Sequence, residues 1–254
     1  MKGWRGVIVP VVLLALAEIA FRVRGGPSDS LAPPSRAIAA LLSILRDGSL
    51  VVGSAQTLGT LLAGLALGSL AGVTAGTALG SSDLLRRMTF LTIEMLRPIP
   101  SVALLPLSLL IFGFGYRMEI AVIAFATFWP SLILTQSAVV QIEPRLTEVA
   151  RLLRLSRWQT AAKIILPAAA PRLMTALRLA AGLALVVAVT AEIVSNPQGL
   201  GHDLMIAQET LRPERMFAVL FWVGLIGWGK NAALLRLERR LFAHRGDVDT
   251  GIAA

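Results

Sequence analysis

Apolar blocks of about 20 residues dominate the sequence, and their length constrains the fold more than any other feature. A helix of about 20 residues crosses a hydrocarbon core about 30 Å thick, because each helical residue adds about 1.5 Å. Six such blocks can be read, at approximately residues 7–21, 51–79, 91–114, 120–137, 173–194 and 216–235. We therefore expect an all-α, polytopic membrane protein with six transmembrane helices, in which residues 1–254 form a single transmembrane domain.

The composition agrees with this interpretation and excludes several function classes. Apolar residues make up 56% of the chain and charged residues only 15%, whereas soluble domains are about 25% charged. Cysteine is absent, so disulfides and thiolate metal sites are excluded. The net charge of +9 could indicate nucleic-acid binding, but the basic residues lie between apolar blocks and form no single basic face. We expect no nucleic-acid partner.

The basic residues instead predict how the chain crosses the membrane. Cytoplasmic segments retain Lys and Arg, and the basic segments here are the N-terminus, 81–90, 139–171 and the C-terminal tail. These segments alternate as six spans require, so both termini are expected in the cytoplasm. The first block could be a signal peptide, but no small-x-small cleavage site follows Ala20, so we interpret it as an uncleaved span.

Residues 31–48 have a different pattern. Apolar residues recur at helical spacing from Ile38 to Leu45, Pro34 suits a helix start, and Gly48 suits a stop. This segment is too short to cross the bilayer. It predicts a helix lying at the outer membrane interface.

The second block carries a packing signal. Glycines repeat at intervals of four along it: Gly64, Gly68, Gly72, Gly76 and Gly80. Such a ridge lies on one side of a helix and lets a neighbouring backbone approach closely. We assign the ridge to helix packing and to no chemistry.

Two features of the apolar blocks are candidates for a solute pathway. The third block begins with Arg97-Pro98-Ile99-Pro100, where each proline removes a backbone donor. Broken backbone at membrane depth is tolerated beside protein or a watery cavity, so this segment, with Ser101, either lines a pathway or forms the first turn of the helix outside the core. Glu192, with Thr190, is the other candidate, since intramembrane charges are costly. The alternatives for Glu192 are a structural pairing with Arg97 or a position at the wet interface.

Catalytic and nucleotide-binding constellations are not expected. Gly224, Gly229 and Lys230 have the spacing of a phosphate-binding loop, but Asn231 replaces the required Ser or Thr, and the motif lies inside an apolar block. His202 and His244 have no partner at metal-ligand spacing. We therefore predict no enzyme activity, no metal site and no cofactor in this chain.

The polar stretch 141–171 predicts two short helices. Pro144 suits the first turn of one, and Ser156 with Gln159 has capping-box spacing for a second that Pro167 ends. One side of the first helix carries charges at intervals of three: Arg145, Glu148, Arg151 and Arg154. The other carries Leu146, Val149, Ala150 and Leu153. Such a two-sided hairpin is either a docking surface or an interfacial loop.

A family resemblance favours the docking surface. Glu148-Val149-Ala150, followed by Ile165-Leu166-Pro167, resembles the EAA loop of ABC-importer permeases, the binding-protein-dependent inner-membrane components. Shorter pieces resemble the subgroup for sulfonate, taurine and nitrate: Pro98-Ile99-Pro100, Leu104-Leu105-Pro106-Leu107, Ser156-Arg157-Trp158-Gln159, Thr190-Ala191-Glu192 and Gly199-Leu200-Gly201. The resemblance covers nearly the whole chain.

This resemblance implies a type I ABC-importer permease fold in the bacterial inner membrane and ATP-driven import of a small organic or anionic solute. It implies a homodimer, a cytoplasmic ABC ATPase that binds ATP and Mg²⁺, and an extracytoplasmic solute-binding protein. The coupling residues would be Glu148, Val149, Ala150, Arg151, Leu153, Arg154 and Pro167. The pathway residues would be Arg97, Pro98, Pro100, Ser101, Thr190 and Glu192. The alternative function is a stand-alone secondary transporter or channel, which would need no docking hairpin.

The sequence departs from the family pattern at Arg154, where the family usually has glycine. If the position needs a positive φ, arginine is strained there by about 1 kcal/mol or more. Otherwise the coupling helix continues through Arg154.

Overall fold

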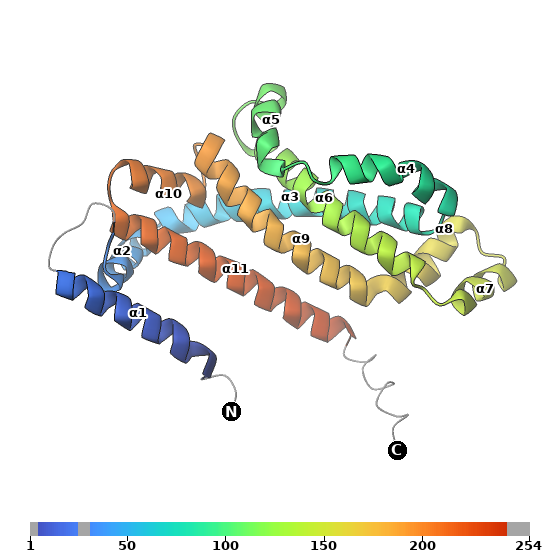
Figure 1. Cartoon of the computed structure of the whole chain (residues 1–254), viewed down its shortest axis with the longest axis horizontal. Coiled ribbons are helices and arrows are strands. Elements are labelled where there is room, and N and C mark those ends of the chain that lie inside the picture. The colour runs from blue at the N-terminus through green and yellow to red at the C-terminus, as the bar shows by residue number, and fades with distance from the viewer. Residues whose placement is uncertain (1–4, 25–30, 243–254) are drawn as a thin grey trace, which may run out of the picture.

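The computed structural model describes residues 5–24 and 31–242, and all the regular structure in those residues is helical (Figure 1). Four long apolar helices could each cross a membrane: α3 (Ser49–Gly80), α6 (Tyr116–Val140), α9 (Leu166–Ser195) and α11 (Pro213–Phe242). A fifth span results if α4 (Asp83–Leu96) and α5 (Leu105–Phe112) form one broken span. The all-α, multi-span class is confirmed, whereas the count of six spans stays a prediction.

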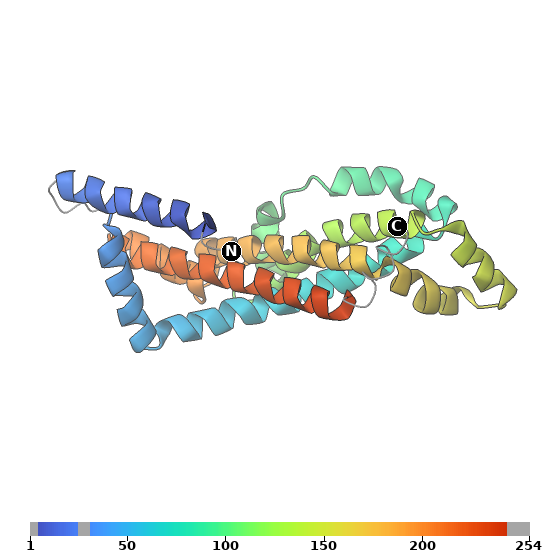
Figure 2. The same ribbon diagram turned by 90° about the horizontal axis from the view of Figure 1, so that it is seen from below.

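The long helices run side by side along an elongated molecule whose two ends differ (Figures 1 and 2). One end carries α7 (Pro144–Leu152) and α8 (Arg157–Thr160), and we call it the α7 end. The opposite end carries α2 (Pro34–Arg46) and α10 (Leu200–Glu209), and we call it the α10 end. Helix α1 (Arg5–Arg24) is attached through α2, where Ser35 Oγ donates to the Glu18 carboxylate over 3.0 Å.

The glycine ridge of α3 lies directly against α6. A Cβ atom added to Gly64 would come within 2.6 Å of Ile123 Cβ, and one added to Gly80 would come within 2.6 Å of Val139 Cβ. Between them, a Cβ at Gly68 would collide with Thr127. The two backbones therefore pack at a separation that only glycine permits, and this pair organises the core that α9 completes.

The third predicted span differs from the structure in its boundaries. Residues 81–90 lie before the third apolar block, which was read from residue 91, but α4 begins at Asp83, where Ser82 Oγ caps the amide of Leu85 at 3.5 Å. After 14 residues the chain breaks at Pro98–Pro100, turns by 81°, and continues through η1 (Ser101–Leu104) into α5. The proline segment therefore lies at a sharp bend between α4 and the η1–α5 segment.

Two further expectations about helix boundaries were wrong. Pro167 does not end a helix, because α8 continues through the π-helical turn η2 (Ala161–Ile165) into α9, and Pro167 occupies the first turn of α9. Proline is tolerated in a first turn, and the wider π turn before it accommodates the change in hydrogen bonding. Residues 196–215, between the fifth and sixth apolar blocks, were assigned no helix, but they contain α10.

Candidate functional site

The backbone conformation of Arg154 shows whether α7 ends or continues at this residue. Arg154 has φ +48°, so α7 stops there and does not continue. The amide of Leu155 donates to the carbonyl of Ala150, and the amide of Arg154 donates to that of Arg151, each over 3.0 Å. These bonds close the helix in the way that a C-terminal glycine normally does. An arginine here adopts the backbone conformation that glycine adopts without strain.

The start of the following helix matches its prediction. The Ser156 amide donates to Gln159 Oε1 over 2.9 Å, and the Gln159 amide donates to Ser156 Oγ over 3.3 Å. This reciprocal pair is a capping box, and it fixes the direction in which α8 leaves the α7 turn. The predicted capping box is confirmed.

The hairpin presents large apolar side chains that nothing in the described chain covers. Leu152 is 82% exposed, Trp158 is 79% exposed, and Leu153 also lies open. We call these three residues the apolar tip. Ala150 of α7 is buried, whereas Glu148 is exposed. Exposed apolar patches of this kind mark interaction sites, and charged neighbours such as Arg151 disfavour burial in lipid tails.

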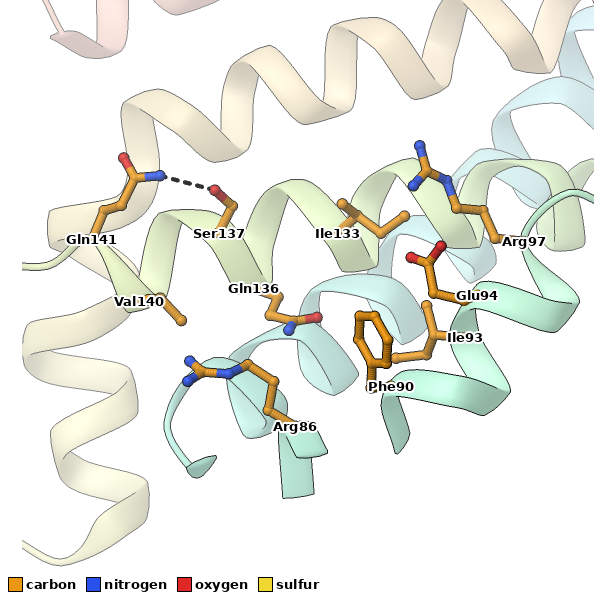
Figure 3. A pocket seen from close by; sticks show the side chains of 10 residues that line it. All are labelled: Arg86, Phe90, Ile93, Glu94, Arg97, Ile133, Gln136, Ser137, Val140 and Gln141. Carbon is orange, nitrogen blue, oxygen red and sulfur yellow. Dashed lines mark hydrogen bonds between the residues drawn. The ribbon is translucent and has the colours of Figure 1, made fainter. Parts of the chain in front are cut away.

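A cavity of about 380 Å³ lies between α4 and α6 (Figure 3). Its wall combines four apolar side chains with charged, amide and hydroxyl groups: Arg86, Phe90, Ile93, Glu94, Arg97, Ile133, Gln136, Ser137, Val140 and Gln141. The Gln141 amide donates to Ser137 Oγ over 3.0 Å within this wall. The cavity therefore offers polar groups beside the bend between α4 and η1.

The two arginines stand at opposite ends of this cavity (Figure 3). Arg86 and Arg97 are eleven residues apart along the α4 segment, a separation of about 16 Å. Arg86 also pairs with Asp83 at 2.5 Å. Both arginine side chains line the cavity, so it carries basic groups from two positions of the α4 segment.

The other predicted pathway residues lie away from this cavity. Thr190 Oγ1 donates to the carbonyl of Val186 in its own helix, over 2.7 Å. Glu192 is only 1% exposed, and its carboxylate accepts bonds from Thr57 Oγ1 at 2.7 Å and the Gly201 amide at 2.8 Å. The alternatives of a pairing with Arg97 and of a wet position are both wrong for Glu192.

A second buried carboxylate, Glu119, was missed by the sequence reasoning. Glu119 is fully buried in the first turn of α6, where Thr60 Oγ1 lies 2.5 Å from Oε1 and Asn196 Nδ2 donates to Oε2 over 2.8 Å. Glu119 lies between the third and fourth apolar blocks of the sequence, which were read as ending at 114 and starting at 120. The available signal was the pair of threonines at 57 and 60, one turn apart in an apolar helix, which can supply hydroxyl partners.

The apparent phosphate-binding motif is not a loop. Gly224 to Lys230 lies within the uninterrupted helix α11, and Lys230 Nζ donates to the carbonyl of Ala181 on α9. Without a loop, the backbone amides cannot cradle phosphates. No group of His, Asp and Glu able to hold a metal occurs among residues 5–24 and 31–242, and His244 lies outside them.

Residues 64–242 match the family model described as binding-protein-dependent transport system inner membrane component. The chain belongs to this family. It is therefore a multi-pass permease subunit of an ATP-driven importer in the inner membrane, and such subunits are not enzymes. The family works with ATPase and solute-binding partners, so the alternative of a stand-alone secondary transporter or channel is excluded.

Relatives and solved structures agree with this assignment. The permease is 30% identical to the taurine transport system permease protein TauC of Escherichia coli, over 86% of this chain and 81% of that protein. It is 32% identical to the nitrate import permease protein NrtB of Leptolyngbya laminosa, over 70% and 64% of the two chains. A chain of the inward-facing MetNI methionine ABC transporter superposes with a TM-score of 0.68 at 21% identity, covering 75% of the permease and 95% of that chain. The fold is thus that of the type I importer permeases.

Proposed function

We propose that the permease imports a small organic or anionic solute, and that its hairpin 141–171 docks on a cytoplasmic ABC ATPase that binds ATP and Mg²⁺. The apolar tip carries this proposal, because Leu152 and Trp158 are almost fully exposed at the end of a segment that projects from the bundle. Burying these side chains in a groove of another protein would stabilise the complex by roughly 1.5–3 kcal/mol for each. Glu148 and Arg151 then lie beside the contact as polar, orienting residues.

The distribution of charge supports a cytoplasmic location for the α7 end. Arg145, Arg151, Arg154 and Lys163 belong to its hairpin. Helix α11 runs from the α10 end towards the α7 end and finishes with Arg239 and Arg240 in its last turn. Because basic segments are retained in the cytoplasm, this charge distribution supports the proposal that both termini lie there and that α2 lies at the outer interface.

An anionic solute fits both the relatives and the cavity. Two relatives are named for taurine and nitrate transport, and both compounds carry an anionic group. Arg97 stands at the break between α4 and η1, where Pro98, Pro100 and Ser101 interrupt the helix. We propose that this break lines the pathway, with Thr190 on α9 as a further wall residue, and that a second copy of the permease supplies the opposite wall.

The remaining partner is a solute-binding protein at the α10 end. The α10 end lies opposite the hairpin and contains the short helix α10, whose residues Ile206, Gln208 and Glu209 are exposed (Figure 1). Delivery at one end and ATPase closure at the other give an alternating-access cycle in which the long helices transmit the movement.

Copurification tests the docking assignment. The variants Glu148→Lys and Leu152→Asp should lose the ATPase subunit and ATP-dependent uptake while the permease remains folded in detergent. Glu209→Lys, at the opposite end, is the matched control and should retain the ATPase. Retention of the ATPase by both hairpin variants would contradict the assignment.

A further inference from the structure

The first turn of α10 is held entirely by side chains of other helices. Three consecutive amides donate across the bundle: Gly199 N to Gln56 Oε1 over 3.0 Å, Leu200 N to Thr57 Oγ1 over 3.0 Å, and Gly201 N to Glu192 Oε2 over 2.8 Å. The N-cap residue Gly199 has no side chain to contribute. The amides at a helix start need external acceptors, and here α3 and α9 provide them.

This contact is tight because two glycines permit it. Gly199 has φ +92°, and a Cβ atom there would collide with the Glu192 carboxyl group. A Cβ atom on Gly201 would lie 2.6 Å from Glu192 Cβ. The backbone of α10 therefore rests directly on α9 at Glu192.

Helix α9 also connects this contact to the hairpin. Residues Trp158–Ser195 form one continuous helical run of 38 residues through α8, η2 and α9. It begins beside the apolar tip and ends three residues after Glu192. A movement of the hairpin is thus carried along one helix to the α10 end.

We propose that Glu192 is a positioning residue that fixes α10 to α9, so that the docking face for the solute-binding protein moves with the helix that the ATPase drives. The position of α10 then changes with the state of the ATPase, because the buried carboxylate of Glu192 holds α10 against α9. This inference rests on the proposed function for the identity of the two partners, but the attachment of α10 itself does not.

The hydrogen bonds indicate why this residue is glutamate and not glutamine. Thr57 Oγ1 accepts a hydrogen bond from the Leu200 amide and donates its own hydrogen to Glu192 Oε1. Gly201 N donates to Oε2, so both oxygens of Glu192 must accept. A glutamine would direct its NH₂ group at one of these donors and leave that donor unpaired.

Glu119 provides a matched control, because its surroundings tolerate glutamine. Asn196 Nδ2 donates to one oxygen, and a glutamine oxygen can accept that bond. At the other oxygen, Thr60 Oγ1 can donate to the Thr57 carbonyl at 3.1 Å and accept from a glutamine NH₂. The two buried carboxylates are therefore distinguishable by one substitution.

A spin label on α10 tests the attachment in the permease alone. The chain has no cysteine, so Glu209→Cys introduces a single labelling site on an exposed residue of α10. Adding Glu192→Gln should raise the population of mobile label by about tenfold, which corresponds to about 1.4 kcal/mol. Glu119→Gln should leave the spectrum unchanged. Unchanged mobility with Glu192→Gln, or an equal increase with Glu119→Gln, would overturn the proposal.

Thr57→Val tests the same contact with the carboxylate retained. It removes the hydroxyl that joins Glu192 to the Leu200 amide, and Thr57→Ser is its control. Mobile label should increase with valine and not with serine. Equal spectra for the two variants would contradict the role assigned to this contact.

The consequence for transport is measured with the complete transporter in vesicles containing the solute-binding protein and the ATPase. Glu192→Gln should reduce the ratio of binding-protein-stimulated to basal ATP hydrolysis by about tenfold. This is the same factor as the expected increase in the population of detached α10. Glu119→Gln should keep the ratio. If the solute-binding protein does not stimulate ATP hydrolysis by the transporter with the unsubstituted permease, the proposed function is contradicted. If it stimulates the unsubstituted transporter and the Glu192→Gln variant equally, only this inference is contradicted.

Discussion

The carboxylate of Glu238 on α11 forms an ion pair with the guanidinium of Arg178 on α9. The two side chains are 27% and 31% exposed, so the pair is partly shielded from solvent. Lys230, on the same side of α11, reaches the carbonyl of Ala181 on α9. Together these polar contacts hold the second half of α11 against the helix that we propose transmits movement from the hairpin.

Reversing one partner of this pair should destabilise the bundle. Arg178→Glu should lower the free energy of unfolding by roughly 1–3 kcal/mol, because two carboxylates then face each other in a partly shielded site. The double variant Arg178→Glu, Glu238→Arg should recover most of the loss. Thermal unfolding in detergent measures both, and a double variant no more stable than the single one would show that the ion pair is not the cause.

The glycine ridge should tolerate no side chain where α6 approaches. Gly68→Ala places a methyl group against Thr127 and should cost about 1–3 kcal/mol of stability through overpacking. Gly59→Ala is the control on the same helix, because a Cβ atom there meets nothing within 4 Å. Equal melting temperatures for the two variants would mean that α3 and α6 do not pack as described.

Replacing Arg154 by glycine should relax the turn that ends α7. Arginine in the left-handed region carries a backbone strain of about 1 kcal/mol that glycine lacks. Arg154→Gly should therefore increase amide hydrogen-exchange protection at Leu155, whose amide bonds Ala150. Reduced protection at that amide would indicate that the arginine side chain, and not the backbone, stabilises the turn.

Removing the charge at the helix break should weaken transport of an anion. Arg97→Gln should raise the apparent KM for an anionic solute by about tenfold, the loss expected for a hydrogen bond to a charged group. Arg87→Gln is the control, because Arg87 is an exposed arginine of α4 outside the cavity lining. Equal uptake by the two variants would remove Arg97 from the proposed pathway.

Much of the fold could be predicted because its signals are local. The interval of four in the glycine ridge indicates a close helix contact, and the Ser156–Gln159 spacing indicates the capping box that the structure contains. The prediction that Pro167 ends a helix was wrong, because the local sequence does not distinguish a proline in the first turn of a helix from a proline that follows a helix. The difference lies in the π turn η2, which has no simple sequence signature.

The buried carboxylates could not be placed from sequence because their partners are distant along the chain. Glu119 bonds Asn196, 77 residues away, and Glu192 bonds Thr57, 135 residues away. Only the packing of α3, α6 and α9 brings these residues together. The short helix α10 was missed for the same reason, because its capping groups belong to other helices.

Cysteine accessibility at the apolar tip measures the proposed docking most directly. Leu152→Cys introduces a single thiol at a position of α7 where the leucine is 82% exposed, and a membrane-impermeant maleimide reports its location. The thiol should react in inside-out vesicles without the ATPase, become protected when the ATPase subunit is added, and stay unreactive in right-side-out vesicles. Reaction in right-side-out vesicles, or no protection by the ATPase, would contradict the account.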